Sequence, residues 1–267
     1  MSRRKPRVLL FDIGGVCVVS PFQAILDYEA SHSIPRGWIN YAISKSSPNG
    51  SWQRLECGEI PLDAQFFASY KSDLENPSHW QTYTHQLRQK NPTASPISSH
   101  PPSINAEELF WLMMGISRTP DPYMYPALQK LHASRQFTLG ALSNTVIFPE
   151  GHPYNSRTSS REDLRTYFDV FISSAHVGLR KPDPRIYELA LGRLRERVRE
   201  REGKGAGDLR AEEVVFLDDI GENLKAARSA GMRTVKVLLG RSKEAVRELE
   251  KITGLELLED DEASAKL

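Results

Sequence analysis

Short apolar runs separated by longer amphipathic segments make up most of this chain. The apolar runs have the length and composition of buried strands, and they occupy residues 8–11, 137–142, 170–172, 214–217 and 234–238. Helical patterns separate most of these runs, at residues 125–133, 184–197 and 221–230. Strands that alternate with helices predict an α/β fold, in which a Rossmann-like parallel sheet is covered by helices on both faces.

This alternation stops between about residues 20 and 118. The stretch has helical patterns and loops but few strand signals, and it includes a loop rich in Pro and Ser at residues 91–105. The simplest architecture is a core with a helical insertion directly after the first strand. We therefore expect a helical cap domain at residues 20–118. The α/β core then comprises residues 1–19 and 119–258, followed by a flexible tail at residues 259–267.

Size and charge limit the classes of partner. The chain has 267 residues, of which 39% are hydrophobic, so it can bury a substantial core. With 35 basic and 34 acidic residues the net charge is +1, and no global field attracts nucleic acid or a membrane surface. Since no apolar run approaches the roughly 20 residues of a membrane span, we expect a small-molecule partner.

Polar residues gather where the predicted strands end. Asp12 follows the first strand, Ser143 follows the second, and Asp218 and Asp219 follow the fourth. Parallel sheets bind their ligands at the carboxyl ends of the strands, so these residues are candidates for one shared site.

The residue types at these positions suit metal and phosphate chemistry. The adjacent carboxylates of Asp218 and Asp219 repel each other, and a cation is the usual remedy. Oxygen ligands without a nearby Cys or His cluster favour Mg²⁺ over zinc. The Ser143 hydroxyl and nearby backbone N–H groups suit an oxyanion, and Lys181 can neutralise phosphate charge. Each feature alone also fits an ordinary cap, turn or surface residue; their joint occurrence favours a site.

Four segments in order, "LLFDIGGV", "ALSNT", "RKPDP" and "FLDDIGEN", carry a resemblance. The chain resembles the haloacid dehalogenase superfamily. Within it, the chain is most similar to the amino-terminal phosphatase domain of soluble epoxide hydrolase and to the related domain of acyl-CoA dehydrogenase family member 10. The resemblance covers nearly the whole chain and implies a core of the superfamily fold with an inserted helical cap of the C1 type. It also implies hydrolase activity on a phosphate monoester.

The resemblance implies a nucleophile and a metal site. Asp12 matches the residue that attacks phosphorus and forms an aspartyl-phosphate. Mg²⁺ is then held by the Asp12 carboxylate, the backbone carbonyl of Gly14 and the carboxylate of Asp219.

The remaining motif residues match positions that bind phosphate or support the metal. Ser143 and the backbone N–H of Asn144 match the phosphate-binding segment, and Lys181 bridges the nucleophile and the phosphoryl oxygens. Asp218 matches an outer position that orients metal-bound water or Lys181. Asn223, one turn into the following helix, supports the metal shell.

Gly14 departs from the pattern of the superfamily. Its phosphatases usually carry an acid two residues after the nucleophile, which protonates the leaving group and then activates water. Glycine can do neither, and such a group contributes roughly 10²–10⁴-fold to the rate. The metal loses nothing, because its ligand here is a main-chain carbonyl. Glu150 and His152, in the loop after "ALSNT", are candidates for a substitute acid.

Three functions follow from this pattern. The favoured one is a Mg²⁺-dependent phosphatase with a substitute acid or slow turnover. The alternatives are a 2-haloacid dehalogenase-like hydrolase, which also lacks the second acid, and a catalytically weak binding or regulatory protein that keeps the fold. All four tryptophans lie in the insertion, either as its own core or as an apolar wall over the site. An aromatic wall would suit a phosphate with an apolar tail.

Two further features bear on the compartment. Cys17 and Cys57 are the only cysteines, which predicts a reducing compartment without a disulfide framework. The chain ends in Ala265-Lys266-Leu267, close to the Ser-Lys-Leu peroxisomal address. A cytoplasmic location is the default expectation, and peroxisomal targeting through this tripeptide is the alternative.

Overall fold

A five-stranded parallel sheet forms the centre of the molecule. The computed structural model describes residues 5–90, 98–155, 163–203 and 207–258. The strand order is β3-β2-β1-β4-β5, and every pair is parallel. The predicted α/β fold class is thereby confirmed. The strands are β1 (Val8–Phe11), β2 (Thr138–Ser143), β3 (Val170–Ser173), β4 (Val214–Asp218) and β5 (Arg233–Lys236).

Most strand ends lie one or two residues away from the ends of the predicted runs. The fifth run was expected to end at Leu238, but β5 stops at Lys236 because Leu238 and Leu239 turn out toward solvent. The tail with Ala265-Lys266-Leu267 and residues 91–97 of the Pro- and Ser-rich loop lie outside the described residues.

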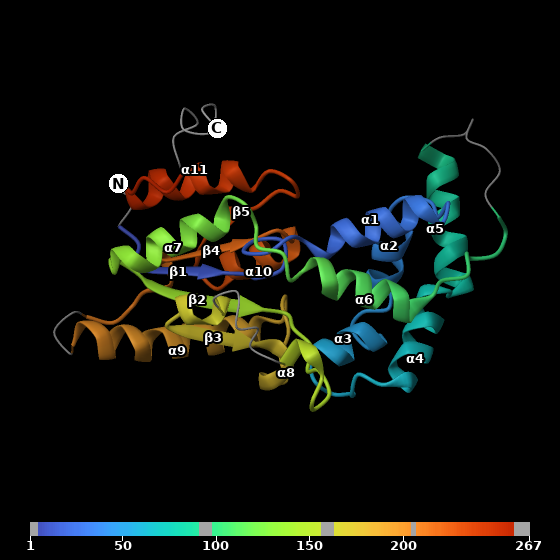
Figure 1. Cartoon of the computed structure of the whole chain (residues 1–267), viewed down its shortest axis with the longest axis horizontal. Helices are drawn as coiled ribbons and strands as arrows, with labels where there is room; N and C mark the ends of the chain where they lie inside the picture. Colours follow the sequence, from blue (N-terminus) through green and yellow to red (C-terminus); the bar gives the residue numbers. More distant parts are fainter. Residues whose placement is uncertain (1–4, 91–97, 156–162, 204–206, 259–267) are drawn as a thin grey trace.

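Helices cover both faces of the sheet, as Figure 1 shows. Successive side chains of a strand point to opposite faces. Leu9 and Phe11 of β1 pack toward α7 (Met124–Ser134) and α11 (Ser242–Thr253). The alternate residues of the strand, Val8 and Leu10, pack in the cluster formed with α9 (Pro184–Glu202) and α10 (Gly221–Ser229). Both faces of the central strand β1 are buried, which explains why this strand is apolar throughout rather than alternating.

A helical lobe lies beyond one end of the sheet (Figure 1). The helices of this lobe pack around their own apolar cluster, which contains the buried rings of Trp38 and Trp80. Trp52 and Trp111 are only partly buried against it, so two tryptophans are core and two reach its edge. The helices are α1 (Pro21–Ser31), α2 (Trp38–Lys45), α3 (Ser51–Glu56), α4 (Ala64–Leu74), α5 (Pro77–Lys90) and α6 (Ala106–Ile116).

The two connections between lobe and sheet run side by side. Ser20 caps α1 with its hydroxyl, which accepts a hydrogen bond from the backbone N–H of Phe22 at 3.3 Å. The chain returns after α6, where the backbone N–H of Val19 donates to the carbonyl of Thr119 at 2.8 Å. Because the outgoing connection leaves from the carboxyl end of β1 and the returning one is hydrogen-bonded to it, the lobe is held over the end of the sheet where ligands bind.

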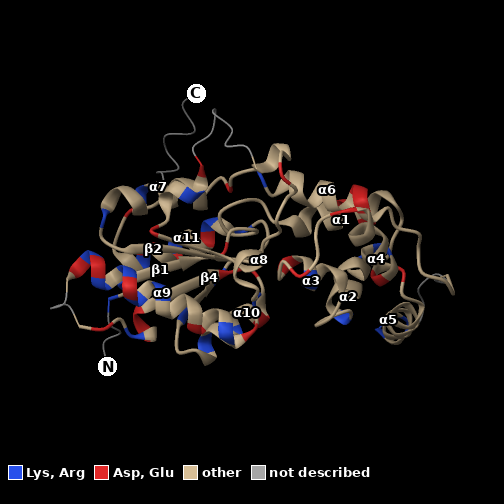
Figure 2. Ribbon diagram, turned by 90° about the horizontal axis from the view of Figure 1, so that it is seen from below, with Lys and Arg blue, Asp and Glu red and all other residues tan. Residues whose placement is uncertain are grey.

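Charges of both signs share the outer helices. Figure 2 shows blue and red segments interleaved along α9. Within that helix Arg197 pairs with Glu200 at 3.4 Å, and it also pairs with Asp169 at 3.1 Å. This agrees with a net charge of +1 and leaves no single-sign face along α9. Among the described residues, none of the helices combines the length and apolarity that a membrane crossing requires.

Substitution of Leu249 measures how much the packing of α11 against the sheet contributes to stability. Its side chain is fully buried against the sheet, whereas that of Leu239 is 42% exposed. We expect Leu249→Ala to lower the free energy of unfolding by about 2–5 kcal/mol, because it leaves a cavity in the core. Leu239→Ala, the matched control, should change it by less than about 0.5 kcal/mol. Urea denaturation measures both, and equal effects would contradict this packing.

Candidate active site

Asp12 lies at the carboxyl end of the central strand. Its backbone N–H continues the ladder to the carbonyl of Leu217 at 2.9 Å, so its position is fixed by the sheet. One carboxylate oxygen accepts the backbone N–H of Ile13 at 2.7 Å. Because β1 lies between β4 and β2, the ends of those strands place Asp218 on one side of Asp12 and Ser143 on the other.

Lys181 connects the two buried carboxylates. Its Nζ lies 2.8 Å from Oδ2 of Asp12 and 2.6 Å from Oδ2 of Asp218, and its side chain is fully buried. Asn144 fixes the backbone of this lysine, since its amide oxygen accepts the Lys181 N–H at 2.8 Å. The Asn144 amide nitrogen donates to the Lys181 carbonyl at 3.1 Å. Lys181 is therefore held by residues from three other segments of the chain, with Asp12 and Asp218 at its ammonium group and Asn144 at its backbone.

The carboxylate of Asp218 has its acceptor positions filled. It accepts hydrogen bonds from Lys181 Nζ, from the backbone N–H of Ile220 at 2.7 Å, and from the Asn223 amide, which lies 3.1 Å from each oxygen. A carboxylate offers about four acceptor sites, so little capacity remains for a metal ion. Asn223 is itself held in place, because its main-chain carbonyl accepts a hydrogen bond from the Tyr187 hydroxyl at 2.9 Å. Asp218 thus acts as an anchor for Lys181.

Asp219 faces the same cluster with much freer oxygens. One ligand atom from each of Asp12, Asp218 and Asp219 lies within 4.8 Å of the other two. The described hydrogen bonds to the Asp219 side chain comprise one long contact of 3.4 Å from the Ser20 hydroxyl. The oxygens left available for a metal ion are therefore mainly those of Asp12 and Asp219.

Burial makes this concentration of charge unfavourable. It raises the pKa of Asp12 to about 6, although the Lys181 ammonium opposes the shift. Burial, with the charges of Asp12 and Asp218, also raises the pKa of Asp219 to about 8. For Lys181 burial acts to lower the pKa, but the two carboxylates outweigh it and the net shift is upward. Three acids share one ammonium, and a further cation would relieve the imbalance.

The two glycines after Asp12 have different roles. Gly15 has a φ of +77°, and a Cβ atom there would lie 2.3 Å from Oδ2 of Asp219. Only glycine therefore lets the loop pass this carboxylate. Gly14 has no positive φ, and a Cβ there would meet Pro21 at an ordinary 3.5 Å. The backbone at residue 14 therefore does not require glycine, and an acidic side chain could be accommodated there.

Sequence reasoning did not find Ser20, Gly15 or the contact between Glu56 and Arg180. Arg180 donates to the Glu56 carboxylate through Nε at 2.8 Å and lies 2.7 Å from it through a second nitrogen. This ion pair joins α3 to the segment that carries Lys181. The Gly-Gly doublet and the Ser-Pro cap signal were available in the sequence. The ion pair was not, because 124 residues separate its partners.

The two candidates for a substitute acid lie in a different environment. Glu150 is exposed. His152 stacks on Trp111 and Phe148, with ring centroids 5.0 and 5.2 Å apart. None of the hydrogen bonds among described residues joins His152 to Asp12 or Lys181. The structure thus places this histidine in an aromatic cluster between α6 and the loop after β2.

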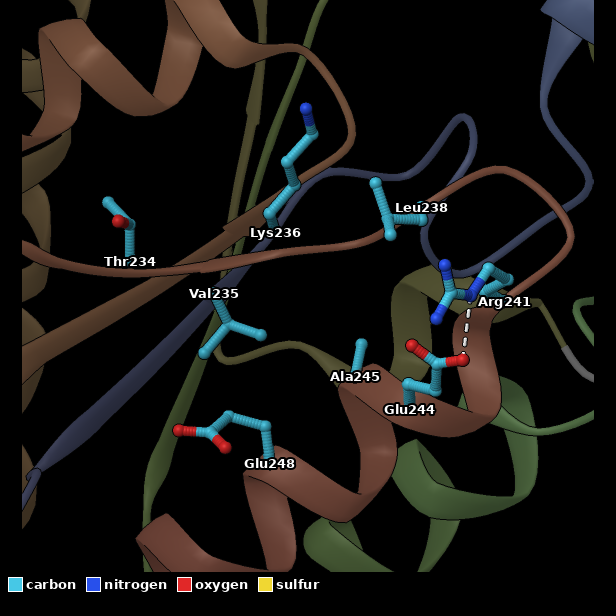
Figure 3. Close-up of a pocket in the computed structure, with 8 residues that line it drawn as sticks. All are labelled: Thr234, Val235, Lys236, Leu238, Arg241, Glu244, Ala245 and Glu248. Atoms are coloured by element: carbon cyan, nitrogen blue, oxygen red, sulfur yellow. Dashed lines mark hydrogen bonds and ion pairs between the residues drawn. The ribbon is translucent and has the colours of Figure 1, made fainter.

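Two grooves open on the surface. One, with a volume of about 590 Å³, lies between the loop after α3 and the loop after β2, and its lining is mainly apolar. The other, of about 360 Å³, lies between β5 and α11 (Figure 3). Arg241 Nε donates to Glu244 there at 2.7 Å, and Lys236 lies across from them. None of the candidate site residues lines this second groove.

Comparison with known proteins shows the family to which the chain belongs. The model of haloacid dehalogenase-like hydrolases matches residues 6–231. The chain belongs to this family of hydrolases. It is 30% identical over 256 residues to acyl-CoA dehydrogenase family member 10 of Mus musculus, covering 95% of this chain and 20% of that protein. It is also 30% identical over 254 residues to bifunctional epoxide hydrolase 2 of Sus scrofa, covering 95% and 40%. The chain thus spans less than half the length of these relatives.

Solved structures of haloacid dehalogenase-like hydrolases share the fold. A predicted hydrolase of the family from Porphyromonas gingivalis superposes with a TM-score of 0.52 and 18% identity, covering 92% of this chain and 98% of that one. A dehalogenase described in an intermediate complex gives a TM-score of 0.51 and 17% identity, covering 94% and 99%. At this identity the likeness concerns the fold alone.

The neighbouring glycines provide a matched pair of variants. We expect Gly15→Ala to lower the free energy of unfolding by more than about 1–2 kcal/mol, because its backbone is left-handed and the new methyl group would meet the Asp219 carboxylate. Gly14→Ala, one residue away, should change it by less than about 1 kcal/mol. Thermal denaturation followed by circular dichroism measures both. A tolerated alanine at residue 15 would show that the loop can move away from Asp219.

Proposed function

We propose that the chain is a Mg²⁺-dependent phosphatase that acts on a small phosphate monoester through an aspartyl-phosphate. The observation that carries the proposal is the charge balance at the end of the sheet. The carboxylates of Asp12, Asp218 and Asp219 meet there, and among the described ion pairs Lys181 contacts the first two of them and leaves Asp219 without a cation. A divalent cation would balance the remaining charge and at the same time attract a phosphate dianion.

The donor set fits a magnesium ion. Mg²⁺ prefers oxygen ligands, and carboxylates with a main-chain carbonyl and water are its usual partners. Asp219 supplies carboxylate oxygens with one long described contact, and each Asp12 oxygen keeps an acceptor position beyond its bond to Lys181 or to the Ile13 N–H. Gly14 supplies the carbonyl. When bound, the ion would neutralise charge on the phosphoryl group.

The chain's own residues then perform the covalent step. The Asp12 carboxylate attacks phosphorus, and the bond to the leaving oxygen breaks. Lys181, held against Asp12, bears positive charge next to the phosphoryl oxygens, and it costs no reorganisation because Asp218 and Asn144 already fix it. Ser143 and the backbone N–H of Asn144 stand at the end of β2, where they can donate to the same oxygens.

An apolar tail on the substrate is part of the proposal. The apolar groove is lined by Leu55 and Ile60 on the lobe side and by Ile147 and Phe148 on the core side. Its core wall begins only three residues after Asn144, so a chain bound there would start near the phosphate site. A lining of this kind favours hydrocarbon over a sugar hydroxyl pattern.

A dehalogenase-like reaction is the second candidate, and one observation favours it. Gly14 removes the acid that phosphatases of this superfamily usually carry, and carbon-halogen cleavage needs no such acid. That reaction does not need the Asp219 carboxylate and its metal, however. Metal dependence therefore separates the two functions.

Asp12 is the proposed nucleophile. Asp12→Asn should abolish hydrolysis of an aryl phosphate, at least to below a thousandth of the wild-type rate, because the amide neither attacks phosphorus nor replaces the anion as a ligand. Folding should be retained, since the side chain amide can still accept the Ile13 N–H. Hydrolysis rates and circular dichroism are measured together. A folded variant that keeps a tenth of the activity would contradict this role.

Metal removal tests the proposed role of Mg²⁺. Treatment with EDTA should remove phosphate hydrolysis, and added Mg²⁺ should restore it, because Asp12 and Asp219 alone leave the site with excess negative charge. Hydrolysis of a 2-haloacid, measured in the same samples, serves as the comparison. EDTA-resistant release of halide, without phosphate turnover, would favour the dehalogenase-like reaction.

A further inference from the structure

The proposed phosphatase reaction needs a proton donor that the loop after β1 does not supply. Gly14 has no side chain, and His152 is engaged with aromatic rings. An alkoxide leaving group is a strong base, so its departure without a proton is slow. A donor must therefore reach the site from another element, and the ends of the neighbouring strands are the nearest candidates.

A chain of short hydrogen bonds runs across the ends of β2 and β3. The Thr145 hydroxyl lies 2.5 Å from the Ser173 hydroxyl, and either oxygen can be the donor. The Ser173 hydroxyl lies 2.7 Å from Nδ1 of His176. Thr145 follows directly after Asn144 at the proposed phosphate site, and Ser173 ends the adjacent strand. The chain thus starts beside the site and leads away from it across the sheet.

Buried contacts fix the Thr145 end of this chain, which directly follows Asn144. The backbone N–H of Thr145 donates to the Ser174 hydroxyl at 2.8 Å, and that hydroxyl donates to the carbonyl of Glu56 at 2.6 Å. Ser174 is fully buried. A Cβ on Gly58 would lie 2.3 Å from the carbonyl of Ala175, so the turn after α3 passes close to α8 (Ser174–Val177). Thr145 is therefore held at the junction between the lobe and the sheet.

The far end of the chain is open to water. His176 is exposed, so its ring can exchange protons with solvent. Histidine is the side chain that takes up and releases protons most readily near neutral pH. Hydroxyl groups both donate and accept, so Ser173 and Thr145 can pass a proton on without being charged themselves.

We propose that His176, Ser173 and Thr145 form a proton relay that replaces the acid missing at Gly14. As the bond between phosphorus and the leaving oxygen breaks, Thr145 gives its hydroxyl proton to that oxygen. Thr145 takes a proton from Ser173, which takes one from the His176 imidazolium. When water then attacks the aspartyl-phosphate, its proton returns along the same path to neutral His176. Each cycle consumes one water, and the relay ends as it began.

This inference rests on the proposed phosphatase function, and its test separates the relay from a capping role. Ser173 is the residue that precedes α8, and although its hydroxyl makes no capping hydrogen bond, its bonds to Thr145 and His176 also tie β3 and α8 to the end of β2. A structural defect lowers the turnover of all substrates together. Loss of the relay lowers kcat/KM only where the leaving group needs a proton, because kcat/KM covers the steps up to the departure of that group and not the later attack of water.

The experiment compares leaving groups. We measure kcat/KM with Mg²⁺ for p-nitrophenyl phosphate, whose leaving group needs no proton, and for hexyl phosphate, whose alkoxide does. His176→Gln and Thr145→Val should each lower kcat/KM for hexyl phosphate by about 10²-fold or more, and leave p-nitrophenyl phosphate within about threefold of wild type. His152→Gln is the matched control and should show no such split.

A rescue variant provides the second measurement. Adding Gly14→Asp to His176→Gln should restore hexyl phosphate turnover, because it places an acid where the backbone accepts a side chain. Equal losses for both substrates, unchanged kinetics in the His176 and Thr145 variants, or a split in His152→Gln would overturn the relay. If the wild-type protein hydrolyses neither phosphate, the phosphatase proposal itself is rejected and the relay falls with it.

Discussion

The contact of one buried ammonium with two carboxylates organises this molecule. Lys181 Nζ lies within 2.8 Å of Asp12 and 2.6 Å of Asp218, at the ends of two adjacent strands. Neither a buried lysine nor a buried aspartate is tolerated alone, because desolvation of an unpaired charge costs several kcal/mol. Each partner therefore requires the others. Asn144 and Asn223 complete the arrangement by fixing the lysine backbone and the Asp218 carboxylate.

The same contact explains which atoms remain available for chemistry. Lys181 and Asn223 occupy Asp218, so it serves to hold the lysine. Asp12 gives one oxygen to the lysine and one to a backbone N–H, and Asp219 has a single long contact to Ser20. The three acidic residues thus have two roles, because Asp218 holds Lys181 whereas Asp12 and Asp219 keep oxygens available for a metal ion. Gly15 permits this division, because any side chain there would displace Asp219.

The sequence predicted the fold and the members of the cluster, and their roles stay predictions. Strand ends are readable because buried runs stop at polar residues, so Asp12, Ser143 and Asp218 were found from the pattern. Lys181 was a candidate from its place before a proline and a helix start, but its role and the choice of Asn223 required the family resemblance. The contacts between Glu56 and Arg180, and between Thr145 and Ser173, join distant segments, and periodicity carries no signal of such pairs. They appear only when the sheet order is known.

Sheet order also links the acid cluster to the hydroxyl chain. Along the carboxyl ends the order β4, β1, β2, β3 gives Asp218, Asp12, Ser143 and Ser173 in succession. The charges gather on the side of β4, and the hydroxyl groups gather on the side of β3. A phosphoryl group at Asp12 would therefore have cations on one side and neutral proton carriers on the other. Since an acid close to Lys181 and Asp219 would add to an already crowded charge, a proton path through neutral hydroxyls suits this loop better than a third carboxylate beside the nucleophile.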